Sequence, residues 1–274
     1  TMKYFRDFIG TDIHYFKIDY NKHGYNSKIY NSLNHGRGIL ENTAQIKAYK
    51  AYYGELHYYK YVACFEKFYD NFSDELGKKD ISIIDWGCGI GIGSWLFLEK
   101  GENYQHVIKN LKYITLIDMG TFALRNAYSK LCHIRNTDYD FSKVMKTQLK
   151  ADLTTEVSLN FENIFKNIKS KKCHIHIFGN ILDIEKIDRK NIFNNITKKL
   201  KGDNYFICTS PTSTGGAREG IAAFYRLFEK KYKNLKLIFN NIQTVEALYH
   251  NYKMNFQQKK NITQYLSIFK VEIK

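Results

Sequence analysis

The sequence predicts an α/β fold, built on a doubly wound sheet of about seven mostly parallel strands. From residue 81 onward, short apolar segments alternate with amphipathic stretches, and a glycine cluster follows the first segment. The segments are rich in β-branched and aromatic residues, as is typical of strands that are buried on both faces. Alternation of strands and helices favours a parallel sheet with helices on both sides.

Seven strands and five helices are expected in this part of the chain. The strands are predicted over 81–84, 113–117, 147–151, 173–178, 205–208, 235–239 and 264–271, and the helices over 93–100, 121–132, 157–169, 187–201 and 217–232. The last strand follows a long connection and has no crossover helix after it. It is therefore expected to be an antiparallel strand inserted beside its neighbour.

The first 75 residues differ from the rest, and they predict an N-terminal helical and aromatic extension or lid. Twelve of the 22 tyrosines lie between Tyr4 and Tyr69. Apolar residues recur at steps of three and four between Glu41 and Phe72, which is the pattern of an amphipathic helix. Gly54 is expected to divide this stretch into two helices. Residues 76–274 then form the second predicted domain.

Composition limits the class of protein and its compartment. The formal net charge is +15, from 42 Lys and Arg against 27 Asp and Glu, which favours a polyanionic partner such as RNA. The same lysines are also explained by solubility alone. The five cysteines are odd in number and form no Cys-x-x-Cys pair, so neither a zinc site nor a disulfide framework is expected. A cytoplasmic location and no membrane span are expected.

The strongest local signal is the glycine cluster that follows the first predicted strand. The segment 83–95 reads Ile-Ile-Asp-Trp-Gly-Cys-Gly-Ile-Gly-Ile-Gly-Ser-Trp, with Asp85 two residues before Gly87. Glycines at a strand-to-helix turn permit positive φ and let a ligand approach the main chain. The amides that open the next helix then face that ligand. A tight turn without a ligand is the alternative, but four alternating glycines exceed what a turn needs.

This segment resembles the first motif of the class I S-adenosylmethionine-dependent methyltransferases, in which an acid at the end of the first strand precedes Gly-x-Gly-x-Gly. The resemblance covers about 81–274 in the order of its motifs. It implies a Rossmann-like sheet, S-adenosylmethionine as the cofactor, and a methyl transfer reaction. It also implies that the cofactor is bound by Asp85, Gly87, Cys88, Gly89 and Gly91. Asp85 has a second interpretation, in which it holds the glycine turn and a nearby amide.

The second predicted strand ends at Asp118, which Met119 follows. In the family that this chain resembles, an acid here binds both ribose hydroxyls of the cofactor. A carboxylate suits that role because it offers two acceptor oxygens to a diol. An acid in an NAD enzyme does the same work, so Asp118 alone does not separate the two cofactors. An acid at a helix N-terminus is the structural alternative.

Two further strand ends resemble the family. Asp152 and Leu153 follow the third strand, where the family places an acid near the adenine amino group. Gly179 and Asn180 follow the fourth strand. In the family, the end of this strand and the turn after it face the methyl group and the acceptor. A loop aspartate and a helix cap, respectively, are the alternatives. No residue is identified as catalytic, and no metal is expected.

The methyl acceptor is narrowed only by elimination. No Asn-Pro-Pro-Tyr or Asp-Pro-Pro-Tyr follows the fourth strand, and no Pro-Cys stands there, so the signatures of exocyclic amino and cytosine-5 DNA methylation are missing. An oxygen or nitrogen acceptor remains, on RNA or another anionic macromolecule, which the charge favours. The alternatives are a small-molecule acceptor with the N-terminal region as its lid, and a non-catalytic binding module. The oligomeric state is open.

Overall fold

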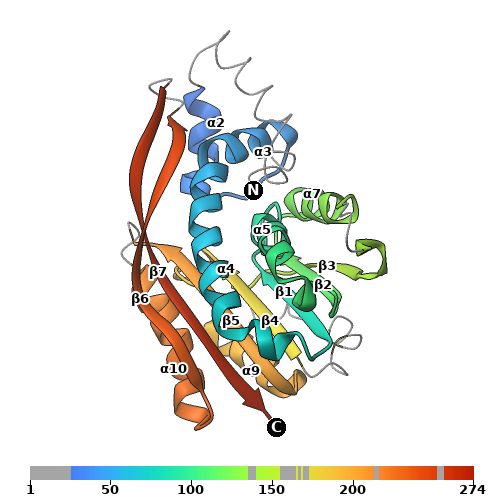
Figure 1. Cartoon of the computed structure of the whole chain (residues 1–274). Helices are drawn as coiled ribbons and strands as arrows, with labels where there is room; N and C mark the ends of the chain where they lie inside the picture. The colour runs from blue at the N-terminus through green and yellow to red at the C-terminus, as the bar shows by residue number, and fades with distance from the viewer. Residues whose placement is uncertain are drawn as a thin grey trace.

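The structure is a computed structural model that describes residues 26–134, 140–154, 165, 168, 173–212, 216–251 and 256–274. A seven-stranded sheet runs through it in the order β3-β2-β1-β4-β5-β7-β6 (Figure 1). The strands are β1 (Ile81–Trp86), β2 (Leu111–Asp118), β3 (Met145–Lys150), β4 (Cys173–Gly179), β5 (Gly202–Pro211), β6 (Lys236–Asn251) and β7 (Phe256–Ile273). β7 is antiparallel to both β5 and β6, and the β1–β2, β1–β4, β2–β3 and β4–β5 pairs are parallel. The predicted fold class, with an antiparallel strand inserted beside its neighbour, is confirmed.

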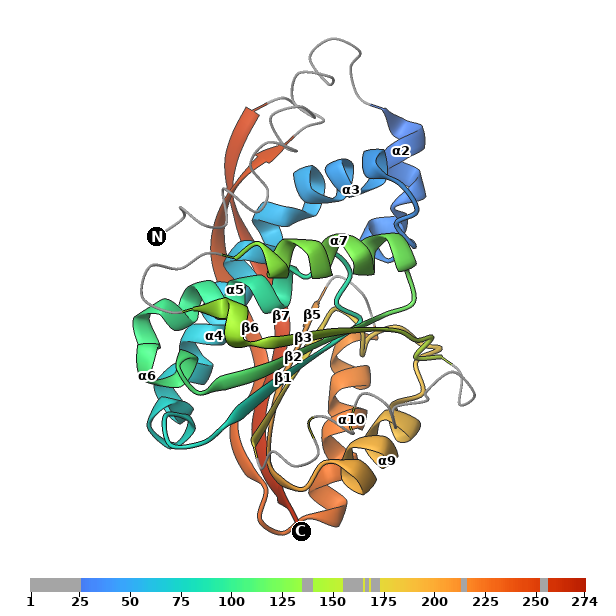
Figure 2. The ribbon, with the colours of Figure 1, turned by 90° about the vertical axis from the view of Figure 1, so that its right-hand side faces the viewer.

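Helices cover both faces of the sheet. They are α2 (Ser27–Ser32), α3 (Thr43–Tyr49), α4 (Glu55–Leu76), α5 (Ile92–Gly101), α6 (Gln105–Ile108), α7 (Thr121–Cys132), α9 (Arg189–Lys199) and α10 (Ala217–Lys231). Successive side chains of β1 point to opposite faces, so Ile83 packs into the core beneath α4, α5 and α7, and Ile84 into the core beneath α9 and α10. Figure 2 shows the sheet between these two helical layers. The helix predicted over 157–169 lies almost wholly outside the described residues.

The last two strands are much longer than predicted. β6 has 16 residues and β7 has 18, and their outer halves form a twisted two-stranded ribbon that extends beyond the rest of the sheet (Figure 1). The prediction relied on apolar runs, which mark strands with a buried face. The ribbon has little buried surface, and pairs such as Glu246 with Asn261 are exposed, so no apolar run marks it.

The predicted break at Gly54 is absent, because Gly54 keeps helical dihedrals. α3 passes into α4 through a π-helical segment, Lys50–Gly54, which widens the helix by one residue without interrupting it. The described part of the N-terminal region shares its core with the sheet, since Phe65 and Phe68 of α4 belong to the same buried cluster as Ile83. A division of the chain at residue 75 stays a prediction.

α4 is fixed to the sheet by a buried glutamine. The Nε2 of Gln264 on β7 donates to the carbonyl oxygen of Lys60, and its Oε1 accepts from the hydroxyl of Thr209 on β5. Such buried, fully partnered polar groups specify one docking geometry. The arrangement holds α4 against β5 and β7. No described helix has the length and apolarity that a membrane span requires.

Candidate functional site

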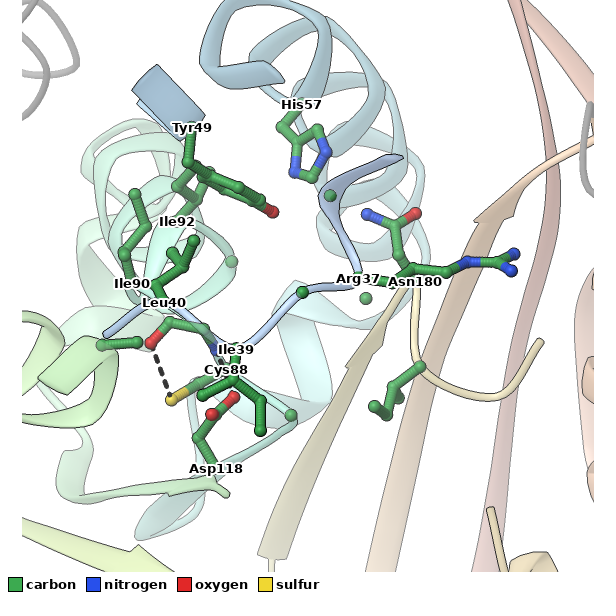
Figure 3. Close-up of a pocket in the computed structure, with 18 of the residues that line it drawn as sticks. Arg37, Ile39, Leu40, Tyr49, His57, Cys88, Ile90, Ile92, Asp118 and Asn180 are labelled. Atoms are coloured by element: carbon green, nitrogen blue, oxygen red, sulfur yellow. Dashed lines mark hydrogen bonds between the residues drawn. The ribbon is translucent and has the colours of Figure 1, made fainter. Parts of the chain in front are cut away.

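A cavity lies at the carboxyl ends of β1, β2 and β4, where parallel α/β sheets bind their ligands. Its empty space, including solvent at the open mouth, is about 810 Å³. Figure 3 shows its walls converging from the glycine turn, from α3 and α4, and from a crossing N-terminal segment. The lining residues are Gly36, Arg37, Gly38, Ile39, Leu40, Tyr49, His57, Tyr61, Gly87, Cys88, Gly89, Ile90, Ile92, Gly93, Asp118, Met119, Ala123, Gly179, Asn180, Ile181 and Ile184.

The glycines of the turn have different physical roles. Gly87, Gly89 and Gly91 all have positive φ, at 65°, 54° and 81°. A Cβ on Gly89 would meet no protein atom within 4 Å and would therefore enter the cavity. A Cβ on Gly91 would lie 3.0 Å from the Cβ of Ala127, so this glycine lets α5 and α7 pack closely. Gly91 does not line the cavity, and its predicted contact with the cofactor has no support from this placement.

Asp118 lines the cavity at the end of β2, where its carboxylate organises the turn. Its Oδ2 accepts from the amide of Gly89 at 2.8 Å, and its Oδ1 accepts from the amide of Gly120 at 2.7 Å. Burial raises the pKa of Asp118, and the amide hydrogen bonds act in the opposite direction. A carboxylate has about four lone-pair sites, so each oxygen can still accept a hydrogen bond from a ligand.

Asp85 is not at the surface of the cavity. Its side chain is almost fully buried, and its Oδ2 accepts from both the amide and the hydroxyl of Ser94, at 3.0 and 2.7 Å. Burial raises the pKa of Asp85 to about 6, against the hydrogen bonds from Ser94. The carboxyl therefore fixes the first turn of α5 behind the glycine cluster. This position supports the anchoring interpretation and not the predicted contact with the cofactor.

Asp152 and Leu153 also lie away from the cavity. β3 ends at Lys150, and Asp152 then turns back so that its Oδ1 accepts from the amide and hydroxyl of Thr154, at 2.9 and 2.6 Å. Leu153 is buried in the core beneath α9 and α10. The predicted adenine contact at this strand end therefore lacks support, because local hydrogen bonding and core packing direct both side chains elsewhere.

Cys88 and Met119 line the cavity, as expected of residues that follow two adjacent strand ends. Burial raises the pKa of the Cys88 thiol, so this cysteine is a neutral wall residue and not a thiolate nucleophile at neutral pH. Met119 is 43% exposed and adds an apolar side chain to the lining.

The end of β4 brings Gly179 and Asn180 to the opposite wall. A Cβ on Gly179 would lie only 1.6 Å from the hydroxyl of Tyr61, so glycine is required where α4 meets this strand end. Asn180 has a positive φ of 58°, an uncommon conformation for a residue other than glycine. Its backbone N–H donates to the carbonyl oxygen of Thr209 at 2.7 Å. Its Oδ1 accepts from the Nζ of Lys60 at 3.2 Å. Strained non-glycine residues of this kind cluster at functional sites.

The sequence predicted an N-terminal extension or lid, but it did not identify the residues that form the roof of the cavity. The segment 36–40 crosses the mouth, and the guanidinium of Arg37 pairs with the buried carboxylate of Asp183 at 2.7 Å. Ser210 on β5 donates to the other oxygen of Asp183 at 3.1 Å. Tyr49 and His57 add the remaining wall. Their helical spacing was visible in the sequence, but nothing in it linked them to strand ends far along the chain.

Comparisons with known proteins identify the fold. Neither a family profile nor a curated protein matches the chain. Among solved structures, the plantazolicin methyltransferase BpumL, in complex with a monoazolic desmethyl plantazolicin analog and S-adenosylhomocysteine (SAH), is 10% identical with a TM-score of 0.51, over 89% of this chain and 93% of that one. S-adenosylmethionine-dependent methyltransferases from Clostridium acetobutylicum and Leishmania major match at 11% and 10% identity, with TM-scores of 0.34 and 0.41. They cover 90% and 88% of this chain, and 81% and 82% of their own.

The TM-score of 0.51 at 10% identity shows that BpumL and this chain share a fold. In the part of the chain that the structure describes, no group of three His, Cys, Asp or Glu side chains converges on a possible metal site. The chain has the fold of the class I S-adenosylmethionine-dependent methyltransferases.

Proposed function

We propose that this chain is an S-adenosylmethionine-dependent methyltransferase, with its cofactor in the cavity at the glycine turn. One observation carries the proposal: the main chain at Gly89 is bare toward the cavity, directly beside the carboxylate of Asp118. Both features suit a nucleoside. The diol of its sugar can donate to a carboxylate, and a main chain without side chains lets the atoms next to the sugar approach closely. The solved relative in fold, BpumL, was crystallised with SAH.

The two sides of Asp118 suit different parts of a sulfonium nucleoside. The carboxylate would accept from the ribose hydroxyls. The apolar surfaces of Ile39, Leu40, Met119 and Ala123 line the cavity near it and would pack on the adenine ring. The methionine end would then extend along the turn toward Asn180 at the end of β4. The cofactor supplies an activated methyl group; the protein binds, orients and excludes water.

The segment 36–40 would act as a lid over the bound cofactor. It lines the cavity over five consecutive residues, and Arg37 connects it to Asp183 just beyond β4. Removing a charged partner from a buried carboxylate is costly, so the ion pair with Asp183 favours keeping Arg37 in place. The ion pair therefore links closure of the roof to the strand end that faces the acceptor.

Calorimetric titration tests the function. We expect SAH and S-adenosylmethionine to bind with a stoichiometry of one, and NAD not to bind, because the two cofactors share the ribose contact but not the group beyond it. Binding of NAD without binding of SAH would reject the proposal. The titration needs no knowledge of the acceptor.

An RNA acceptor stays a prediction from the net charge of +15. Basic residues of the described helices gather in the last turns of α9 and α10, at Lys198, Lys199, Lys230 and Lys231. Both helices follow parallel strands, so their C-termini lie at the amino-terminal ends of the strands, which is the end of the sheet opposite the cavity. A steep fall in RNA affinity with rising salt concentration would support an RNA partner. An acceptor that binds only in the cavity needs no such salt-dependent RNA binding.

A further inference from the structure

One face of α4 is directed at the end of β4. His57, Lys60 and Tyr61 are spaced i, i+3 and i+4, so they share that face. Lys60 contacts the Oδ1 of Asn180, and the hydroxyl of Tyr61 lies against Gly179. His57 lines the cavity from the same face. Figure 3 shows the His57 ring and the Asn180 amide directed toward the same part of the cavity from two different elements.

The contact with Lys60 fixes which way the Asn180 amide points. Lys60 is 4% exposed, and burial lowers its pKa to about 8, so it is mostly an ammonium at neutral pH. An ammonium only donates hydrogen bonds, so the atom of Asn180 that it contacts is the oxygen. The NH2 group of Asn180 is therefore turned away from Lys60 and presents a donor to the cavity.

His57 presents the opposite hydrogen-bonding character. Burial and the nearby charge of Lys60 lower the pKa of His57, so its ring is neutral at pH 7. A neutral imidazole has one nitrogen with a free lone pair. The rings of Tyr49 from α3 and Tyr61 from α4 stand edge-on to it, with centroids 5.8 and 6.1 Å away, and hold its orientation. The cavity thus has one donor, from Asn180, and one acceptor, from His57.

We propose that the methyl acceptor is a hydroxyl group, held between the Asn180 amide and His57, and that His57 removes its proton. The inference rests on the proposed function. A hydroxyl accepts from Asn180 with its lone pair and donates to His57 with its hydrogen. A protonated amine has no lone pair for Asn180 and is repelled by Lys60. A carboxylate has no proton to donate to the neutral His57 ring.

Proton transfer to His57 would accompany the transfer of the methyl group. The hydroxyl oxygen bonds to the methyl carbon, and the carbon–sulfur bond breaks with both electrons going to sulfur, which loses its positive charge. The O–H electrons stay on oxygen, and the proton passes to His57. The imidazolium then releases that proton to water at the mouth. Because a hydroxyl becomes strongly acidic as its oxygen is alkylated, an imidazole of low basicity is sufficient.

Three aromatic probes that fit walls of tyrosine and histidine test the acceptor class: 4-methylphenol, 4-methylbenzylamine and 4-methylbenzoate. Each is added to the protein with radiolabelled S-adenosylmethionine, and calorimetry with SAH is run in parallel. We expect transfer to 4-methylphenol alone. Preferred transfer to the amine or the carboxylate, or transfer to none of the three while SAH binds, would overturn the hydroxyl assignment. Failure of SAH to bind would reject the proposed function itself.

Variants separate the two roles. His57→Gln should lower kcat for 4-methylphenol by about 100-fold or more and leave the Kd of SAH within about twofold. Asn180→Ala should weaken the binding of 4-methylphenol to the SAH complex by about tenfold, measured by calorimetry without turnover. His133→Gln, at the exposed end of α7, is the matched control and should change neither quantity. Wild-type kcat in His57→Gln, with SAH binding intact, would contradict a catalytic role for His57.

Discussion

Gly89→Ala separates the space for a ligand from the packing of the protein. The added Cβ meets no protein atom within 4 Å, so no steric clash with the fold is expected. The positive φ of 54° costs about 1–2 kcal/mol of stability for a residue with a Cβ. If the cofactor lies against this main chain, the methyl side chain of the introduced alanine occupies space that the cofactor needs. Overpacking of about 1–3 kcal/mol then weakens the binding of SAH by about 5- to 150-fold.

A second glycine serves as the control for the backbone cost. Gly202 has a φ of 92° and is the first residue of β5, so it lies at the end of the sheet opposite the cavity. Gly202→Ala should lower the free energy of unfolding at least as much as Gly89→Ala, and it should leave the Kd of SAH unchanged. Calorimetry gives the Kd, and urea denaturation gives the stability. Equal SAH affinity in Gly89→Ala and the wild type would refute the placement of the cofactor at this turn.

Further substitutions test the carboxylates and the roof. Asp118→Asn should weaken SAH by about 1.5–3 kcal/mol, and Asp152→Asn should not weaken it; equal losses in calorimetry would contradict the ribose assignment. Because burial raises the pKa of Asp85 to about 6 in the fold, its charge costs stability that is absent below about pH 4 and grows until about pH 6. Asp85→Asn removes this charge and keeps an oxygen that accepts from both Ser94 donors. The free energy of unfolding of the variant should therefore exceed that of the wild type by up to about 3 kcal/mol at pH 7 and equal it at pH 4. Equal unfolding free energies at both pH values, measured by denaturation, would contradict the burial argument. Arg37→Ala should cost about 1–3 kcal/mol of stability by removing a charged partner of the buried Asp183 carboxylate, and stopped-flow measurements should show faster release of SAH; an unchanged release rate would refute the lid.

The sheet was predictable because its inner strands are buried on both faces, and burial leaves continuous apolar runs in the sequence. Ile83 and Ile84 of β1 illustrate this, since each enters a different core. The outer ribbon of β6 and β7 left no such run, and its length was underestimated. The wider helical turn at Lys50–Gly54 was also invisible, because a glycine favours a break in isolation and packing of α4 on the sheet overrides that preference.

The candidate site was predictable only in part. Asp85 and Asp118 look alike in sequence, since each ends an apolar strand, yet one is held by Ser94 and the other faces the cavity. The difference depends on the side of the strand end that each carboxylate takes, which a linear pattern does not specify. His57 and Arg37 were missed for another reason. They reach the site from segments more than a hundred residues before the strand end of Asn180, through contacts that exist only in the folded chain.

The most direct test is a crystal structure of the protein with SAH. We expect the ribose hydroxyls to lie within hydrogen-bonding distance of the Asp118 carboxylate, and the nucleoside to contact the main chain at Gly89. Electron density for SAH at any other place, with the space between these two residues filled only by water, would contradict this placement.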